Sequence, residues 1–188
     1  MYYTQNRLLR TATRASIVET WTPGAYLDEL NSYGNNNIED SRLSVDERTM
    51  VFATVAGNGK WDMNIASRPD TTVPFGNIRP LSELNTSSHD NGASLSADGL
   101  TIYFDSDRSG GWNIYQAARM NINDPFGTPQ IISSLTGFVG PTITMDGQTM
   151  LLTDTDSNWD IYASYIIPEP ATILLLGIGG LLLKKPKR

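Results

Sequence analysis

The chain repeats itself with a period of about 50 residues, and this period constrains its fold more than any other feature. Three copies of a nine-residue segment lie at Ser44–Phe52, Ser96–Phe104 and Thr144–Leu152. Each copy is followed by a tryptophan segment, at Trp61–Ala66, Trp112–Ala117 and Trp159–Ser164. Repeats of this length are typical of β-propellers, in which each repeat forms one four-stranded blade.

Each copy combines a tight turn with a strand. The expected turn residues are an aspartate and, in two copies, the glycine after it: Asp46, Asp98, Gly99, Asp146 and Gly147. Asp-Gly is a strong turn signal. Glu47 replaces the glycine in the first copy, so we expect a turn of a different type there. The β-branched and aromatic residues that follow, such as Thr101–Phe104, favour a buried strand.

The order of these motifs is similar to the WD-like propeller repeats of the TolB type. The likeness rests on the Ser-x-Asp-Gly turn and the downstream Asp-Ile-Tyr strand, and it covers residues 38–165. It implies an all-β fold. The sequence predicts a partial, open β-propeller of about three four-stranded blades, plus a C-terminal hydrophobic helix. The expected parts are a degraded or truncated partial blade at 1–37, three repeats at 38–167 and a separate C-terminal segment at 168–188.

The N-terminal part is expected to begin in the middle of a blade. Tyr2–Arg7 is interpreted as a strand end, and Leu27–Leu30 as an outer strand that could complete the last blade. The chain is then either an open arc or part of a larger ring. The first ten residues have no apolar stretch of the kind that an export signal needs. We therefore expect further repeats and a signal peptide to be encoded upstream of Met1.

The last 21 residues have three parts in a fixed order. A proline-bracketed acid, Pro168-Glu169-Pro170, precedes an uncharged, mostly aliphatic run from Ala171 to Leu183. The expected membrane segment comprises Ala171, Leu174, Leu175, Leu176, Leu181, Leu182 and Leu183, and the basic stop Lys184, Lys185, Lys187 and Arg188. A helix of 13 residues would span only about 20 Å, less than the roughly 30 Å of a bilayer core.

This tail resembles the PEP-CTERM sorting signal of Gram-negative and related bacteria, with all three parts present. The resemblance implies an exosortase-type processing enzyme as a partner, and Pro168, Glu169 and Pro170 as the processing motif. It also implies membrane association through the tail before processing, and a final location in the cell envelope or outside the cell. The alternatives are an ordinary tail anchor or a buried C-terminal helix.

Charge and composition exclude several classes of function. Residues 1–167 carry 10 basic and 19 acidic side chains, which argues against a nucleic-acid partner. The chain has no cysteine, so thiol chemistry and disulfides are excluded. No phosphate loop, dinucleotide fingerprint or zinc spacing occurs. We therefore predict no catalytic residue, no metal site and no cofactor.

Two acidic segments come near to a calcium-binding loop without completing one. Asp154-x-Asp156-x-Asn158 continues with Trp159, and Asp105-x-Asp107-x-Ser109 has Gln116 where a bidentate acid is needed. Hydrogen-bonded turns are the expected interpretation. Three of the four tryptophans share one repeat position, so we expect them to pack between blades rather than to stack on sugars. His89 is the only histidine, and no nucleophile elbow accompanies it.

The leading functional hypothesis is an exported, non-catalytic propeller module that binds a protein, peptide or glycan ligand or acts as a surface scaffold. Two alternatives stay open. The chain could be the propeller part of a hydrolase or peptidase whose catalytic domain is absent, or the product of a truncated gene.

Overall fold

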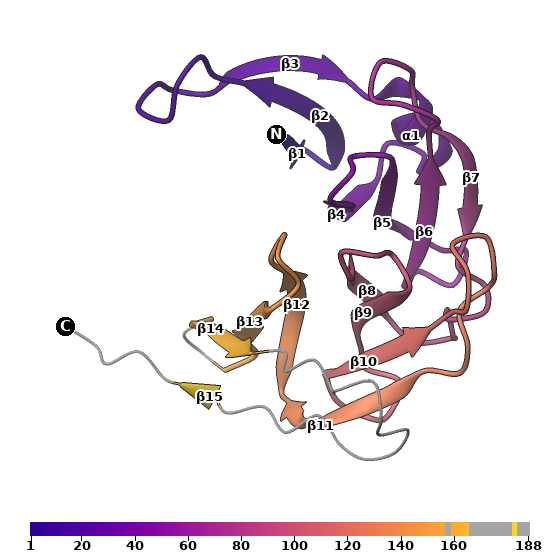
Figure 1. Ribbon diagram of the computed structural model, residues 1–188. Coiled ribbons are helices and arrows are strands. Elements are labelled where there is room, and N and C mark those ends of the chain that lie inside the picture. Colours follow the sequence, from indigo (N-terminus) through magenta and orange to yellow (C-terminus); the bar gives the residue numbers. More distant parts are fainter. Residues whose placement is uncertain (157–158, 166–181, 184–188) are drawn as a thin grey trace.

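The computed structural model describes residues 1–156, 159–165 and 182–183, and these form four antiparallel sheets arranged in an arc (Figure 1). The first sheet has three strands, β1 (Tyr2–Gln5), β2 (Leu8–Thr13) and β3 (Thr22–Tyr26). A helix, α1 (Asp28–Tyr33), follows it. The predicted all-β fold is confirmed.

The other three sheets have four strands each, in sequential order. The second contains β4 (Ile38–Leu43), β5 (Thr49–Val55), β6 (Trp61–Ser67) and β7 (Gly76–Pro80). The third contains β8 (Asp90–Leu95), β9 (Thr101–Ser106), β10 (Asn113–Ala118) and β11 (Gln130–Thr136). The fourth contains β12 (Phe138–Ile143), β13 (Thr149–Asp154), β14 (Ile161–Tyr165) and β15 (Leu182–Leu183).

Apolar layers between successive sheets form the core. Phe52 and Met50 of the second sheet pack against Leu9 and Leu30 of the first sheet and its helix. The same arrangement recurs at the next two junctions, where Phe104 and then Leu152 occupy the position of Phe52. Each repeat therefore buries its apolar side chains only when another sheet lies on its face.

The three predicted turns share one set of hydrogen bonds. The hydroxyls of Ser44, Ser96 and Thr144 each donate to the aspartate two residues on, at 2.6 Å. The same carboxylate oxygen accepts the backbone N–H of the residue two positions further along. These local bonds fix the turn that leads from each inner strand to the next strand.

In two sheets, an arginine at the end of the third strand bonds to the turn between the first two strands and stacks on a phenylalanine in the loop before the outer strand. Arg68 Nε donates to the carbonyl of Glu47 at 2.9 Å, and Arg119 Nε donates to the carbonyl of Gly99 at 3.0 Å. Their guanidinium carbons lie 4.3 and 4.4 Å from the ring centres of Phe75 and Phe126. The first sheet repeats the stacking contact with Arg14 over Trp21, at 4.4 Å.

The turn at Glu47 does not differ from the others, so that expectation was wrong. Glu47 has a φ of 59°, close to the 69° of Gly99 and the 70° of Gly147. A residue with a side chain adopts this left-handed conformation at a cost of about 1 kcal/mol. The shared hydrogen bonds of the turn hold it there.

The interpretation of Leu27–Leu30 as an outer strand was also wrong. The outer strand is β3, and Leu30 is buried on α1. The segment Leu27–Asn31 recurs as Leu81–Asn85, with Leu, Glu, Leu and Asn at the same spacing. The side chains of Asn31 and Asn85 each bond to both backbone groups of one residue in the strand beneath. The i, i+3 leucines follow a helical turn.

The predicted C-terminal helix receives no support. Residues 166–181 and 184–188, which include Pro168, Glu169, Pro170 and the basic stop, lie outside the described residues. Leu182 and Leu183 form β15, paired with Ser164 and Ala163 of β14, so the helix was wrong at these two positions. No helix in the described part of the chain is long and apolar enough to cross a bilayer.

The three repeated tryptophans lie outside the apolar layers, so the expected packing between blades is met only in part, by the Arg7 guanidinium of the first sheet 5.8 Å from the Trp61 ring centre. Trp61 and Trp112 are half-buried, and Trp159 is exposed. They lie just before or at the start of their strands, beyond the apolar layers. The positions between the sheets are instead filled by the residue two places further on, such as Met63 and Ile114.

The strained turn gives a stability prediction. Glu47→Gly removes the left-handed strain but gives the unfolded chain more freedom, and we expect a net gain of about 0.5 kcal/mol in the free energy of unfolding. Denaturant unfolding measures it. Glu19→Gly, at an exposed position outside the left-handed region, is the control and should not stabilise. A loss of stability in Glu47→Gly would show that the glutamate side chain supports the turn.

Candidate functional site

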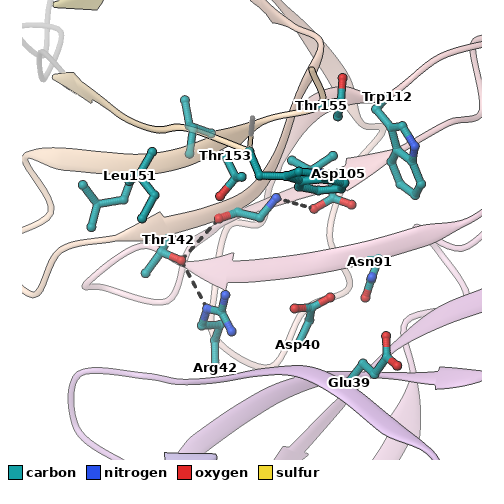
Figure 2. A pocket seen from close by; sticks show the side chains of 15 residues that line it. Glu39, Asp40, Arg42, Asn91, Asp105, Trp112, Thr142, Leu151, Thr153 and Thr155 are labelled. Carbon is teal, nitrogen blue, oxygen red and sulfur yellow. Dashed lines mark hydrogen bonds between the residues drawn. The ribbon is translucent and has the colours of Figure 1, made fainter. Parts of the chain in front are cut away.

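A cavity of about 740 Å³ lies at the inner side of the arc. The inner strands β4, β8 and β12 contribute to its wall, together with parts of β9 and β13 and the loops beside Trp112 and Trp159. Acidic side chains in the wall are Glu39, Asp40 and Asp105 (Figure 2). It is the main candidate for a binding site among the described residues.

All three inner strands are interrupted at the same repeat position. Pairing with the neighbouring strand shifts between Glu39 and Arg42, between Asn91 and Ser94, and between Val139 and Thr142. Within each interruption one residue has a positive φ: 47° at Asp40, 58° at Gly92 and 63° at Gly140. Such bulges release backbone groups from the ladder and turn side chains toward the space beside the sheet.

Asp40 is therefore a carboxylate where the other two copies have glycine. A residue with a side chain in the left-handed region is strained, and strain of this kind concentrates at functional sites. Its carboxylate raises the pKa of Asp105 electrostatically, so the two acids interact across the cavity.

Asp105 is a nearly fully buried acid in the cavity wall. Its Oδ1 accepts the backbone N–H of Gly140 at 2.7 Å. A Cβ atom placed on Gly92 would lie only 1.9 Å from the same oxygen, so this position requires glycine. Gly92 thus leaves the space that the carboxyl group occupies, and Gly140 supplies the backbone N–H that it accepts.

Burial raises the pKa of Asp105 to about 7. The value of about 7 already includes the smaller effects of the Gly140 N–H and the Arg42 guanidinium, which lower this pKa, and of the Asp40 charge, which raises it. Burial also raises the pKa of Glu39, against the effect of Arg7. The carboxyl of Asp105 can therefore exchange its proton near neutral pH.

A chain of polar contacts crosses the site. Arg42 Nε donates to Thr142 Oγ1 at 3.2 Å, and this hydroxyl donates to the carbonyl of Gly140 at 3.3 Å. The chain continues from the Gly140 N–H to Asp105, as Figure 2 shows. Asn91 Oδ1 is buried at the wall and has no hydrogen-bond donor within the described residues. The site thus holds an acceptor that a ligand could satisfy.

Apart from Thr153 and Thr155, the rest of the wall is mostly aromatic and aliphatic. Trp112 lies 6.0 Å from the His89 ring, centre to centre, and borders the cavity. Trp159, Leu151 and Ile161 border it from the last sheet. An acidic centre beside indole rings suits a cationic group, because the ring faces attract positive charge.

Of the residues singled out from the sequence, Asp105, Trp112 and Trp159 border the cavity, and the other described ones have other partners. Asp107 Oδ1 accepts the backbone N–H of His89 at 2.9 Å and takes no part in the hydrogen bond between Gly140 and Asp105. The His89 ring accepts the backbone N–H of Trp61 at Nδ1, and its Nε2 contacts Lys60 Nζ. Asp46, Asp98 and Asp146 hold their turns and do not line the cavity. Within the described ranges, no three His, Cys, Asp or Glu side chains are placed to hold a metal ion.

Sequence reasoning missed Glu39, Asp40, Arg42 and Asn91, and treated Asp105 only as part of an incomplete calcium loop. A signal was present at Asp40. When the three inner strands are aligned by repeat, Asp40 occupies the position that is Gly92 and Gly140 in the other two. Asp105 likewise occupies the repeat position that is Ala53 and Thr153 in the other two copies.

Comparison with known proteins defines the class of the fold. No protein-family model matches the chain, and no curated protein sequence does. Solved structures match, among them a protein described as TolB from Agrobacterium tumefaciens. This structure has a TM-score of 0.57 and 16% identity, over 88% of this chain and 53% of that one. TolB from Acinetobacter baumannii matches with a TM-score of 0.48 and 16% identity, over 85% and 38% of the two chains.

A puromycin-hydrolyzing peptidase from Mycobacterium tuberculosis has a TM-score of 0.47 and 15% identity, over 70% of this chain and 20% of that one. At these identities the likeness concerns the fold alone. The protein has a β-propeller fold of the TolB type, as its repeats indicate. The chain spans about half the length of the Agrobacterium structure and less of the other two.

The raised pKa of Asp105 predicts a pH-dependent stability. Between the ordinary value of 3.8 and about 7, the native state holds a proton that the unfolded state has lost. The free energy of unfolding should therefore fall as pH rises through this range. Asp105→Asn keeps an acceptor for the Gly140 N–H but cannot ionise. We expect it to gain stability over the wild type, by on the order of 4 kcal/mol between about pH 4 and about pH 8.

Denaturant unfolding across this pH range measures the difference. Asp146→Asn is the control, because the hydrogen bond from Thr144 lowers the pKa of Asp146 below this window. A constant difference between Asp105→Asn and the wild type at every pH would contradict the buried, protonated carboxyl group.

Proposed function

We propose that this protein is an exported, non-catalytic binding module whose propeller holds a cationic group of a peptide, protein or glycan ligand in the central cavity. The observation that carries the proposal is Asp105, a buried acid held between two bulge glycines in the wall of this cavity. Burying a carboxyl group costs free energy, and a bound cation would offset this cost.

The chemistry of the wall supports a cation that also donates hydrogen bonds. An ammonium group has three donors and a guanidinium group has five. Asn91 Oδ1 is a buried acceptor without a donor among the described residues, and Asp105, Asp40 and Glu39 offer further oxygens. Trp112 and Trp159 offer aromatic faces. Arg42 also borders the cavity, and its bond to Thr142 engages its guanidinium group.

The proposal of a non-catalytic role rests on the surroundings of His89. Its two ring nitrogens contact the Trp61 N–H and Lys60 Nζ. A general base needs a free nitrogen within reach of a nucleophile. The sequence also has no nucleophile elbow around any serine.

The proposal of export rests on the tail. The Pro168-Glu169-Pro170 motif, the apolar run and the basic end resemble a PEP-CTERM sorting signal. An exosortase-type enzyme would remove the tail and release the propeller into the cell envelope or the exterior. The tail would hold the protein at the membrane until then.

Calorimetric titration with short peptides tests the ligand class. The probes are acetylated and amidated pentaglycines whose central residue is replaced by lysine, arginine, acetyl-lysine or glutamate. We expect binding of the lysine or arginine peptide only. Because a cation favours the ionised form of Asp105, affinity should rise from about pH 5 to about pH 8. Asp105→Asn should weaken binding at least about tenfold.

Asp107→Asn, near the cavity but bonded to His89, is the matched control and should bind as the wild type does. Equal binding of all four peptides, or none at any pH, would contradict a cation site.

Mass spectrometry of the mature C-terminus tests the sorting proposal. In an exosortase-bearing host, with an export signal supplied, the protein should lose roughly its last 20 residues. Replacing both Pro168 and Glu169 by alanine should block this trimming and leave the protein in the membrane fraction. Thr172→Ala, just beyond the motif, is the control and should be trimmed. Released wild-type protein that still ends at Arg188 would refute the sorting signal.

A further inference from the structure

The last sheet exposes a face that is buried in every earlier sheet. The repeat position occupied by Leu9, Met63 and Ile114 is fully buried against the following sheet. Ile161 occupies the same position in β14 and is 75% exposed. On β13, Leu151 stands where Val51 and Tyr103 are buried, and is 40% exposed. This face has the side chains of an inter-sheet contact without a following sheet among the described residues.

The first sheet exposes the complementary face. The position of Met50, Ile102 and Met150 is buried against the preceding sheet in the other three repeats. Met1 occupies this position in the first sheet and is 52% exposed. Tyr3 occupies the position of Phe52, Phe104 and Leu152, which are fully buried, and is itself only half-buried. The two free faces therefore lie at opposite ends of the arc (Figure 1).

The two ends also carry opposite charge. Residues 1–26, which include β1–β3, contain Arg7, Arg10 and Arg14 and one acidic residue, Glu19. Residues 138–165 contain Asp146, Asp154, Asp156 and Asp160 and no lysine or arginine. Opposite charges steer two surfaces together and disfavour pairing of like ends.

We propose that the β12–β15 face of one copy packs against the β1–β3 face of a second copy. The contact would repeat the junction that already joins successive sheets within the chain. A second copy is the partner that fits, because each copy has exposed apolar residues on both end faces. Its basic first sheet also complements the acidic last sheet of the other copy. Such a contact is head to tail, so each copy keeps one free end unless a ring closes.

The second copy also adds to the cavity described above. Leu151 and Ile161 border that cavity and belong to the proposed contact face. Packing of the partner's β1–β3 sheet on them would close the cavity on this side. The proposed contact does not depend on the identity of the ligand, and its test uses no ligand.

Sedimentation velocity of the full 188-residue chain tests the contact. We expect concentration-dependent association that Ile161→Glu weakens at least about tenfold. Met120→Glu adds the same charge at another exposed apolar residue, in the loop between β10 and β11, and should associate as the wild type does. A wild-type monomer at all concentrations, or unchanged association of Ile161→Glu, would overturn the proposal.

Mixing two defective variants tests the head-to-tail geometry. Ile161→Glu disables one end and Tyr3→Glu the other, so each alone should be monomeric. Their mixture retains one working pair of faces and should form a dimer with one copy of each. Circular dichroism verifies folding, and Arg10→Glu replaces Tyr3→Glu if the latter unfolds. Association through the C-terminal apolar run or through two like faces would instead give no gain on mixing, which would overturn the proposal.

Discussion

Apolar packing between successive sheets is the interaction on which the rest of this structure depends. Each sheet has two faces, and the aliphatic and aromatic residues at fixed repeat positions become buried only when a neighbouring sheet covers them. Local hydrogen bonds at the Ser-x-Asp turns and the arginine contacts set the ends of the strands. Packing thus holds the sheets in an arc, and the same packing leaves apolar faces at its two ends.

The candidate site arises where the repeat departs from itself. The bulge in each inner strand is common to three sheets, but only one carries an aspartate, Asp40, in place of glycine. Asp105 likewise replaces the alanine and threonine of the other copies, and Gly92 leaves room for its carboxyl group. A regular scaffold therefore positions irregular, charged residues around one cavity. This division between repeated packing residues and unrepeated polar residues supports a binding role for the inner side of the arc.

Much of the fold could be predicted from the sequence, because turns and buried strands depend on local residue patterns. The Asp-Gly turns and the strands after them follow this rule. Leu27–Leu30 did not, because it was assigned from its repeat spacing, whereas two leucines three positions apart lie on one face of a helical turn. The packing of the tryptophans was predicted only in part, since recurrence alone does not distinguish a core position from a rim position. The cavity could not be predicted at all, because Asp40 and Asp105 are 65 residues apart and only the arc of sheets brings them near.

The most direct test of the proposed binding site is to titrate the Asp105 carboxyl carbon by nuclear magnetic resonance. The buried acid is the residue around which the proposed site is built, and its ionisation reports its surroundings. We expect the chemical shift of this carbon to titrate with a midpoint at about pH 7. A midpoint near the ordinary value of 3.8 would mean that water reaches the carboxyl group freely, and would contradict the proposed site.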